Sequence, residues 1–238
     1  MKVTILGTSG GYVRCGGANT SLLIENASDK VVIDMGAGVL SNLERVCSLD
    51  SINNIVLTHS HSDHYSDALV SVYGRLISKQ LKRDVTDLSF YGPKDSFLCE
   101  KLSLENVTNY NEINQNIVLK IGSLSLTFYK TIHLVECYAV KCECGGKSIF
   151  YTSDTSYSED LIKVAKNCDL LLVECSILKK FGSGNRIGHM NTEECSTFIK
   201  CVNSKITRLV HLPCYGSLEE IEKECGFNVA KDLEVIEL

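Results

Sequence analysis

The chain has 238 residues, of which 44% are hydrophobic and 22% are charged, and this composition excludes a disordered chain. No apolar run approaches the roughly 20 residues that a membrane-spanning helix needs, so we expect no membrane partner. The formal net charge of −5 argues against a large electrostatic surface for nucleic acid.

The predicted elements alternate between strands and helices along the whole chain. Strands are predicted at residues 3–6, 21–25, 31–34, 55–57, 88–91, 117–120, 124–130, 138–142, 148–151, 170–173, 208–210 and 234–236. Helices are predicted at residues 39–47, 67–78 and 94–102, and three more start near Ser158, Thr192 and Ser217. This order predicts an α/β protein in which outer helices cover sheets, with a single domain over residues 1–238. The first residues read as a strand rather than a secretory signal, so we expect a cytoplasmic protein.

The twelve cysteines do not show the spacing of a zinc knuckle. Cys142 and Cys144 are the closest pair, and two positions on a strand direct both thiols to the same face. They are either a further metal site or, as we favour, small hydrophobic residues kept reduced.

Three of the six histidines fall within six residues, directly after the apolar run at 55–57. These are His59, His61 and His64, with Asp63 between them. A lone histidine is usually a surface or core residue, but three imidazoles and a carboxylate in one tight turn have little packing value. Neutral imidazole and carboxylate together suit zinc, iron or manganese. We therefore predict a metal site.

The spacing in this segment indicates two ions rather than one. His59 and His61 can point to one side of the turn, while Asp63 and His64 point to the other. The remaining ligands must come from elsewhere, and the ends of apolar strands are where active-site loops gather. The candidates at such positions are His133, Asp154 and His211.

Motifs spread over the whole chain resemble those of a known family. In chain order they are residues 6–11 (LGTSGG), 33–36 (IDMG), 59–64 (HSHSDH), His133, 153–155 (SDT), Glu174, 188–190 (GHM) and 211–213 (HLP). Together they resemble the metallo-β-lactamase-fold hydrolases and, among these, the ribonuclease Z-like branch. The resemblance implies a four-layer αβ/βα sandwich of two mixed sheets and a metal-dependent hydrolase.

The resemblance also implies a ligand set for two divalent metal ions. His59, His61 and His133 hold the first metal, Asp63, His64 and His211 hold the second, and Asp154 bridges them. Two ions about 3.5 to 4 Å apart share a water and lower its pKa, so the expected nucleophile is a metal-bridging hydroxide. Asp63 is expected to orient or deprotonate this water, and Asp34 to steady the ligand loop. Zinc is expected first, although these ligands also accept manganese or iron.

The resemblance assigns His189 to the reaction rather than to the metals. In the ribonuclease Z-like branch a histidine at the start of a late helix faces the scissile phosphate, where it stabilises charge or protonates the leaving oxygen. Glu174 resembles the glutamate that orients this histidine. The alternative is that His189 is a plain surface residue near a helix start.

The distance along the chain between two of the ligands bears on the substrate. Only twenty residues separate His133 from Asp154, which leaves no room for the long arm with which full transfer-RNA-processing members grip their substrate. We therefore predict a phosphodiesterase for a small nucleotide or cyclic nucleotide. The short form also resembles the anti-Pycsar phosphodiesterases, which act on cyclic mononucleotides. The alternatives are an RNA 3′-processing endonuclease and a metal-dependent hydrolase of thioesters, lactones or β-lactams.

Two further classes of protein fit the sequence less well. A redox di-iron module resembling this family carries a glutamate at the position of His61 and needs an attached flavin domain. A non-catalytic scaffold would not need the full ligand set. The resemblance also implies a homodimer, with residues 65–81 and the glycine-rich first loop as candidate contacts.

Overall fold

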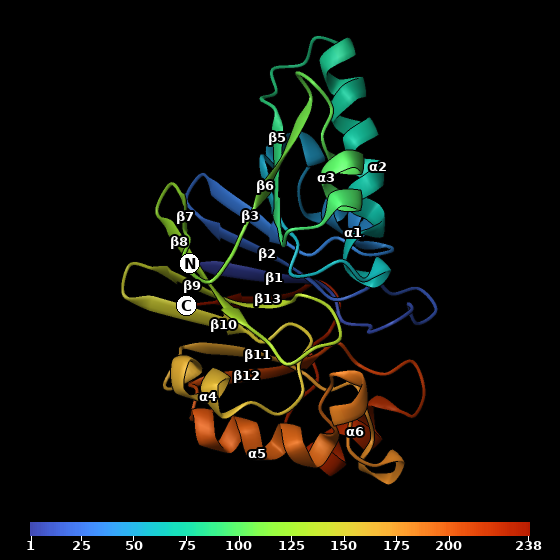
Figure 1. Cartoon of the computed structure of the whole chain (residues 1–238), viewed down its shortest axis with the longest axis vertical. Coiled ribbons are helices and arrows are strands. Elements are labelled where there is room, and N and C mark those ends of the chain that lie inside the picture. Colours follow the sequence, from blue (N-terminus) through green and yellow to red (C-terminus); the bar gives the residue numbers. More distant parts are fainter.

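The computed structural model describes residues 1–238, and its strands form two mixed sheets (Figure 1). The first sheet has the order β13-β1-β2-β3-β4-β5-β6 and the second the order β12-β11-β10-β9-β8-β7. The first sheet contains β1 (Lys2–Gly7), β2 (Ser21–Asn26), β3 (Asp29–Ile33), β4 (Asn54–Val56), β5 (Leu88–Gly92), β6 (Thr108–Glu112) and β13 (Glu234–Glu237). The second contains β7 (Val118–Ile121), β8 (Leu124–Lys130), β9 (Tyr138–Cys144), β10 (Lys147–Tyr151), β11 (Leu170–Glu174) and β12 (Ile206–Val210).

Six helices form the two outer layers. On the outside of the first sheet lie α1 (Val39–Val46), α2 (Ser62–Gln80) and α3 (Ser96–Leu102), and on the outside of the second lie α4 (Glu159–Ala165), α5 (Thr192–Val202) and α6 (Leu218–Cys225) (Figure 1). One apolar core joins the facing sheets, and a separate core fills the space between each sheet and its helices. The predicted four-layer αβ/βα sandwich is therefore confirmed. None of these helices is long and apolar enough to cross a lipid bilayer.

Most predicted elements are found, but the start predicted for the second helix is wrong. It begins at Ser62 rather than near residue 67, with His61 as its extended N-cap residue. Asp63 and His64 therefore lie in the first turn of α2 and not in a free loop. In this first turn the carboxylate of Asp63 interacts favourably with the helix dipole. The polar residues at this helix start hide the apolar periodicity on which the prediction depended.

The sequence also gave no signal for β6. Its residues, TNYNE, are mostly polar, and Asn and Glu are depleted in strands. β6 is nevertheless paired in parallel with β5 at the edge of the first sheet. Pairing with β5, together with burial of Thr108 and packing of Tyr110 against the core under the first sheet's helices, holds this strand in place.

Candidate metal centre

The ends of four strands bring the predicted site residues to one edge of the second sheet. β10, β11 and β12 are parallel, and two antiparallel pairings give β8 the same direction. His133 follows β8, Asp154 follows β10 and His211 follows β12. Glu174 is the last residue of β11. The segment after β4 in the first sheet carries His59 to His64. His189, in the segment before α5, reaches the same place through its contact with Glu174, so the residues predicted for the site lie together.

Strained backbone accompanies these strand ends. Asp34, Ser153 and His211 adopt positive φ angles of 62°, 51° and 51°, a conformation that costs energy for residues other than glycine. Asp34 and His211 directly follow β3 and β12, and Ser153 is the second residue after β10. Such strain is maintained only where the surroundings enforce it, and it is common at functional sites.

The first group of donor atoms consists of three histidine nitrogens and one carboxylate oxygen. Nε2 of His59 and Nε2 of His133 lie 3.1 and 3.0 Å from Nδ1 of His61. Oδ2 of Asp154 lies 3.5 Å from Nε2 of His59. Nitrogens about 3 Å apart fit around a metal ion that is about 2 Å from each.

The second group shares Asp154 with the first. Nε2 of His211 lies 3.2 Å from Oδ2 of Asp63 and 3.3 Å from Oδ1 of Asp154. Nε2 of His64 lies 3.5 Å from each of the same two oxygens. Asp154 therefore directs one carboxylate oxygen to each group, in the arrangement expected of a bridging ligand.

Two buried atoms in these groups lack a hydrogen-bond partner, namely Nε2 of His64 and Oδ1 of Asp154. A buried polar atom without a partner is costly, and a bound cation would remove that cost for both atoms at once. The set of imidazole nitrogens and carboxylate oxygens is also the one that zinc, manganese and iron accept. The residues present therefore fit a divalent metal.

Burial and neighbouring charges give the site the electrostatics of a cation-binding centre. Burial lowers the pKa of His59, His61 and His133, which keeps these imidazoles neutral and able to act as ligands. Burial opposes the charged form of His64 as well, but the carboxylates of Asp154 and Asp34 raise its pKa well above the ordinary value. The carboxylates thus favour positive charge in the centre.

Four of the five histidines in the donor groups are oriented through their other ring nitrogen, as metal-binding histidines usually are. Nδ1 of His64 lies 2.8 Å from Oδ2 of Asp34, and Nδ1 of His133 lies 2.9 Å from the carbonyl oxygen of Gly188. Oγ1 of Thr58 lies 3.1 Å from Nδ1 of His59, and Oγ of Ser176 lies 2.8 Å from Nδ1 of His211. The predicted contact of Asp34 with the ligand segment is thus present.

Thr58, Gly188 and Ser176 were not among the predicted site residues. Thr58 directly precedes His59, and Gly188 directly precedes His189, so adjacency to the motifs was a usable signal for both. Ser176 had no such signal, because its partner His211 is 35 positions away. Only the parallel pairing of β11 with β12 brings the two together.

Asp63 is held by the glycine-rich first loop as well as by the histidines. Its Oδ2 accepts a hydrogen bond of 2.9 Å from the backbone N–H of Gly11. Burial alone would raise the pKa of Asp63, but hydrogen bonds and charges from His211 and His64 hold it well below its ordinary value. The same loop packs against the imidazole of His211, since a Cβ atom on Gly10 would lie only 2.5 Å from its Nδ1. Glycine is therefore required at position 10.

His189 is tied to Glu174 rather than to the donor groups. Its Nδ1 lies 3.1 Å from Oε1 of Glu174, which is completely buried, while 17% of the His189 side chain is exposed. Burial lowers the pKa of His189, but the Glu174 carboxylate outweighs it and raises the pKa to about 9. The imidazole stacks on His211 with ring centroids 5.4 Å apart. His189 is thus a partly buried and oriented side chain, not a plain surface residue.

These side chains open into one pocket of about 350 Å³, within the size range of small-molecule sites. Its polar wall includes His61, Asp63, Asp154, His189 and His211. Its apolar wall is formed by Tyr12, Ile177, Ile187, Pro213 and Tyr215. The pocket therefore combines the donor groups with a surface suited to a flat apolar group.

Cys142 and Cys144 lie on β9, away from this centre. Cys142 is buried in the core between the sheets and Cys144 packs against that core. The only group of three cysteines close enough to share an ion is a different one, formed by Cys175, Cys195 and Cys225.

Comparisons with known proteins agree with this geometry. A family model described as "Anti-Pycsar protein Apyc1" matches residues 1–230. The chain is 31% identical over 225 residues to the probable metallo-hydrolase YhfI of Bacillus subtilis, covering 94% of this chain and 92% of that protein. The crystal structure of YhfI matches with a TM-score of 0.94 over 99% of this chain and 98% of that one, at 29% identity.

Two more distant relatives match over nearly their full length. Anti-Pycsar protein Apyc1 of Bacillus phage 010DV004 is 23% identical over 256 residues, which cover 95% of this chain and 93% of that protein. The short form of human tRNase Z has the same fold, with a TM-score of 0.78 at 18% identity, over 100% of this chain and 99% of that one. The chain therefore belongs to the family described as anti-Pycsar protein Apyc1, within the ribonuclease Z-like branch of the metallo-β-lactamase-fold hydrolases.

Proposed function

We propose that this hydrolase is a phosphodiesterase that acts on a small nucleotide or a cyclic nucleotide. One observation carries the proposal: His189, oriented by the buried Glu174, faces the same pocket as both donor groups. A phosphodiester needs a group that stabilises charge on phosphoryl oxygens or protonates the leaving oxygen. An ester or lactam hydrolase has less need for a histidine at this position.

The proposal includes two divalent metal ions, with zinc as the first candidate. The first would be held by His59, His61 and His133, the second by Asp63, His64 and His211, and both by Asp154. Such ions activate water and polarise the phosphoryl group. The chain contributes the rigid framework, since His59, His64, His133 and His211 are each fixed through the second ring nitrogen.

His189 acts on the phosphoryl group from beside these ions. Because its Nδ1 contacts Glu174, Nε2 is the nitrogen free for substrate. A ring nitrogen of His189 lies within 4.8 Å of donor atoms of Asp154 and His211. An N–H at Nε2 of His189 would therefore lie within reach of the phosphoryl oxygens of a bound substrate, on which negative charge increases during the reaction. Asp63, fixed by Gly11, is in turn able to accept a hydrogen bond from the attacking water.

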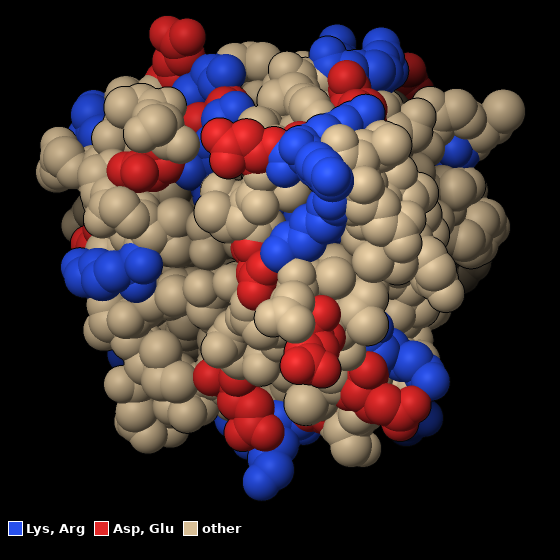
Figure 2. Space-filling view, turned by 90° about the horizontal axis from the view of Figure 1, so that it is seen from above, with Lys and Arg blue, Asp and Glu red and all other residues tan.

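The short connection between His133 and Asp154 and the mixed charge on one face of the molecule favour a small substrate over a folded RNA. Residues 134–153, between His133 and Asp154, form mainly the β9–β10 hairpin, which closes at Gly145 and Gly146 and leaves no arm. On the face of the molecule seen in Figure 2, Lys and Arg side chains alternate with Asp and Glu and form no continuous basic surface. RNA binding depends on neutralising many phosphates. Tyr12 and Tyr215 at the pocket offer rings on which a nucleobase can stack.

The test is an activity profile over bis(p-nitrophenyl) phosphate, cyclic mononucleotides, cyclic dinucleotides and precursor transfer RNA, with zinc or manganese bound. We expect turnover of cyclic mononucleotides or another small phosphodiester, and a loss of about 10²- to 10⁴-fold in kcat for His189→Ala with metal content unchanged. Fully metallated protein that cleaves no phosphodiester would refute the proposal. Thioester or lactone turnover that survives His189→Ala would replace it with the second class of reaction.

We also propose that two copies of the chain pair through α2. Val70, Tyr73, Ile77 and Leu81 follow one another at helical spacing and are 53%, 68%, 52% and 60% exposed. Figure 1 shows α2 at the outer edge of the molecule, where a second copy can approach it. A second copy of the stripe is a self-complementary partner for it in a two-fold dimer.

Sedimentation velocity at micromolar concentration tests the pairing. We expect a dimer of the 26.3 kDa chain that Ile77→Glu converts to a monomer. Val118→Glu is the matched control, because Val118 is equally exposed at 54% but lies on β7. A monomeric wild-type protein, or dissociation by both variants alike, would contradict the α2 interface.

A further inference from the structure

Three cysteines meet beneath the catalytic residues without any role in the proposed reaction. Cys175 follows the last residue of β11, Cys195 lies in α5 and Cys225 is the last residue of α6. The three Sγ atoms all lie within 4.8 Å of one another. The residues are completely or almost completely buried, with exposures of 0%, 0% and 1%. They therefore form a closed cluster of sulfur atoms from three separate elements.

The spacing of the sulfurs is that of a metal site. With metal–sulfur bonds of about 2.3 Å, three sulfurs around one ion in a plane lie about 4 Å apart. The observed limit of 4.8 Å is compatible with this distance after a small adjustment of side chains. Twelve cysteines are present, and all the others lie outside any such group.

The surroundings of the cluster decide which ion it suits. The neighbouring residues belong to the apolar core between the second sheet and its helices, including Val173, Phe198 and Ile221. No histidine or carboxylate side chain joins the three sulfurs as a fourth ligand. Structural zinc is almost always four-coordinate, whereas soft sulfur ligands select monovalent copper.

We propose that Cys175, Cys195 and Cys225 form a second metal site, separate from the histidine and aspartate centre, that binds one Cu⁺ ion through sulfur alone. Each thiol that becomes a thiolate ligand releases its proton to solvent, and the copper keeps its oxidation state. The bound ion connects the end of β11 to α5 and α6. It thereby holds the backbone on either side of Cys175, where Glu174 contacts His189 and Ser176 contacts His211.

One existing contact already joins the cluster to the catalytic residues. The thiol of Cys195 donates a hydrogen bond of 3.3 Å to the carbonyl oxygen of Glu174. Copper binding removes the Cys195 proton and with it this hydrogen bond, so in the occupied site the bond from copper to Cys175, the residue next to Glu174, holds the strand end that orients His189. Because the cluster is closed, the ion has to enter during folding or during a transient opening of α6.

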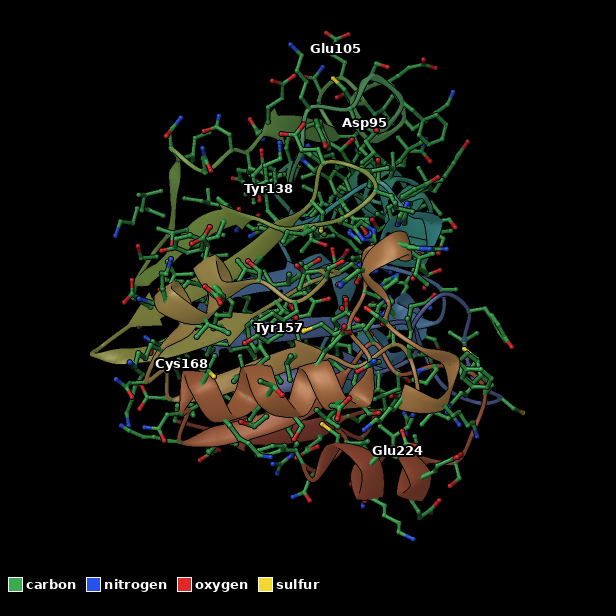
Figure 3. The ribbon with its side chains drawn as sticks, turned by 60° about the horizontal axis from the view of Figure 1, so that its bottom comes forward. Asp95, Glu105, Tyr138, Tyr157, Cys168 and Glu224 are labelled. Carbon is green, nitrogen blue, oxygen red and sulfur yellow. The ribbon has the colours of Figure 1, made fainter.

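The experiment uses the full chain, reduced, unfolded in guanidinium and refolded without oxygen in the presence of Cu⁺. We expect one copper per chain that resists dialysis, with X-ray absorption showing two or three sulfur neighbours and no nitrogen or oxygen. Cys225→Ser and Cys195→Ala should each lose this copper. Cys168→Ser should keep it, because Cys168 is also buried in the same core but lies outside the cluster. Figure 3 shows Cys168 at the opposite end of the helix layer from Glu224, the neighbour of Cys225 in sequence.

Three results would overturn the proposal. The first is copper with nitrogen or oxygen neighbours in the wild-type protein, a measurement that does not depend on the folding of any variant. The second is equal retention of sulfur-bound copper by Cys225→Ser and Cys168→Ser. The third is refolded protein that takes up one Zn²⁺ at the cysteines in preference to Cu⁺, with Co²⁺ in its place giving a thiolate charge-transfer band.

Discussion

Replacing Ser176 by alanine tests how the chain holds its second group of metal ligands. Oγ of Ser176 lies 2.6 Å from Oε2 of Glu174 and 2.8 Å from Nδ1 of His211. A serine hydroxyl has one proton, which it donates to the carboxylate, so it accepts the N–H of His211 Nδ1. This arrangement leaves Nε2 of His211 as the free nitrogen that faces Asp63 and Asp154.

The expected effect of Ser176→Ala is on metal affinity. Loss of a residue that orients a metal-binding histidine typically lowers the affinity 10- to 100-fold, which corresponds to about 1.4 to 2.7 kcal/mol. The loss of metal affinity should affect the second donor group, which consists of Asp63, His64 and His211 with the shared Asp154. His133 and His61 do not contact Ser176, so the other group should bind as before.

Competition with a chelator of known zinc affinity measures this effect, with metal content followed at each chelator concentration. The variant should release one of two ions at roughly 10- to 100-fold lower chelator concentration, while the other ion is retained. Ser156→Ala is the control, because Oγ of Ser156 is buried but has no hydrogen-bond partner. An unchanged release curve for Ser176→Ala, or an equal shift in both variants, would refute the reasoning.

Three more predictions address stability, protonation and metal removal. Asp34→Ala should lower the free energy of unfolding by about 3 to 5 kcal/mol in urea titrations, because it leaves the buried donors of Thr58 and His64 unpaired, and a loss under 1 kcal/mol would contradict this. Glu174→Gln should lower the pKa of His189, which the carboxylate raises to about 9. His189 then loses its proton at lower pH, so the alkaline fall in kcat should move to lower pH, and an unmoved alkaline limb would argue against His189 as the proton donor. Removing metal with a chelator should lower Tm, because it leaves Asp154 Oδ1 and His64 Nε2 buried without partners. Zinc at about 100 times its Kd should restore about 2.7 kcal/mol, and a Tm that does not respond to zinc would show that these atoms hold no ion.

The sequence alone predicted most of the elements and the residues that the structure brings together in the candidate centre. His59, His61 and His64 could be recognised because clustered histidines have little value except as ligands. His133, Asp154 and His211 could be recognised because each follows an apolar strand. Both signals, the clustering of histidines and the position after an apolar strand, are local in sequence, so they can be recognised without the structure.

Other features depended on tertiary structure. β6 has no apolar pattern, and only pairing with β5 makes it a strand. The contact of Ser176 with His211 and the cluster of Cys175, Cys195 and Cys225 join residues that are far apart in sequence.

The difference between what the sequence predicts and what only the structure shows has a physical cause. Which side chains can bind a metal is a matter of their own chemistry, so residue type and spacing were enough to predict the residues of the candidate metal centre. Which side chains orient those ligands depends on how strands pair and where helices end. Only the packed chain decided that a serine after β11 meets a histidine after β12, and that three thiols from β11, α5 and α6 share one buried space.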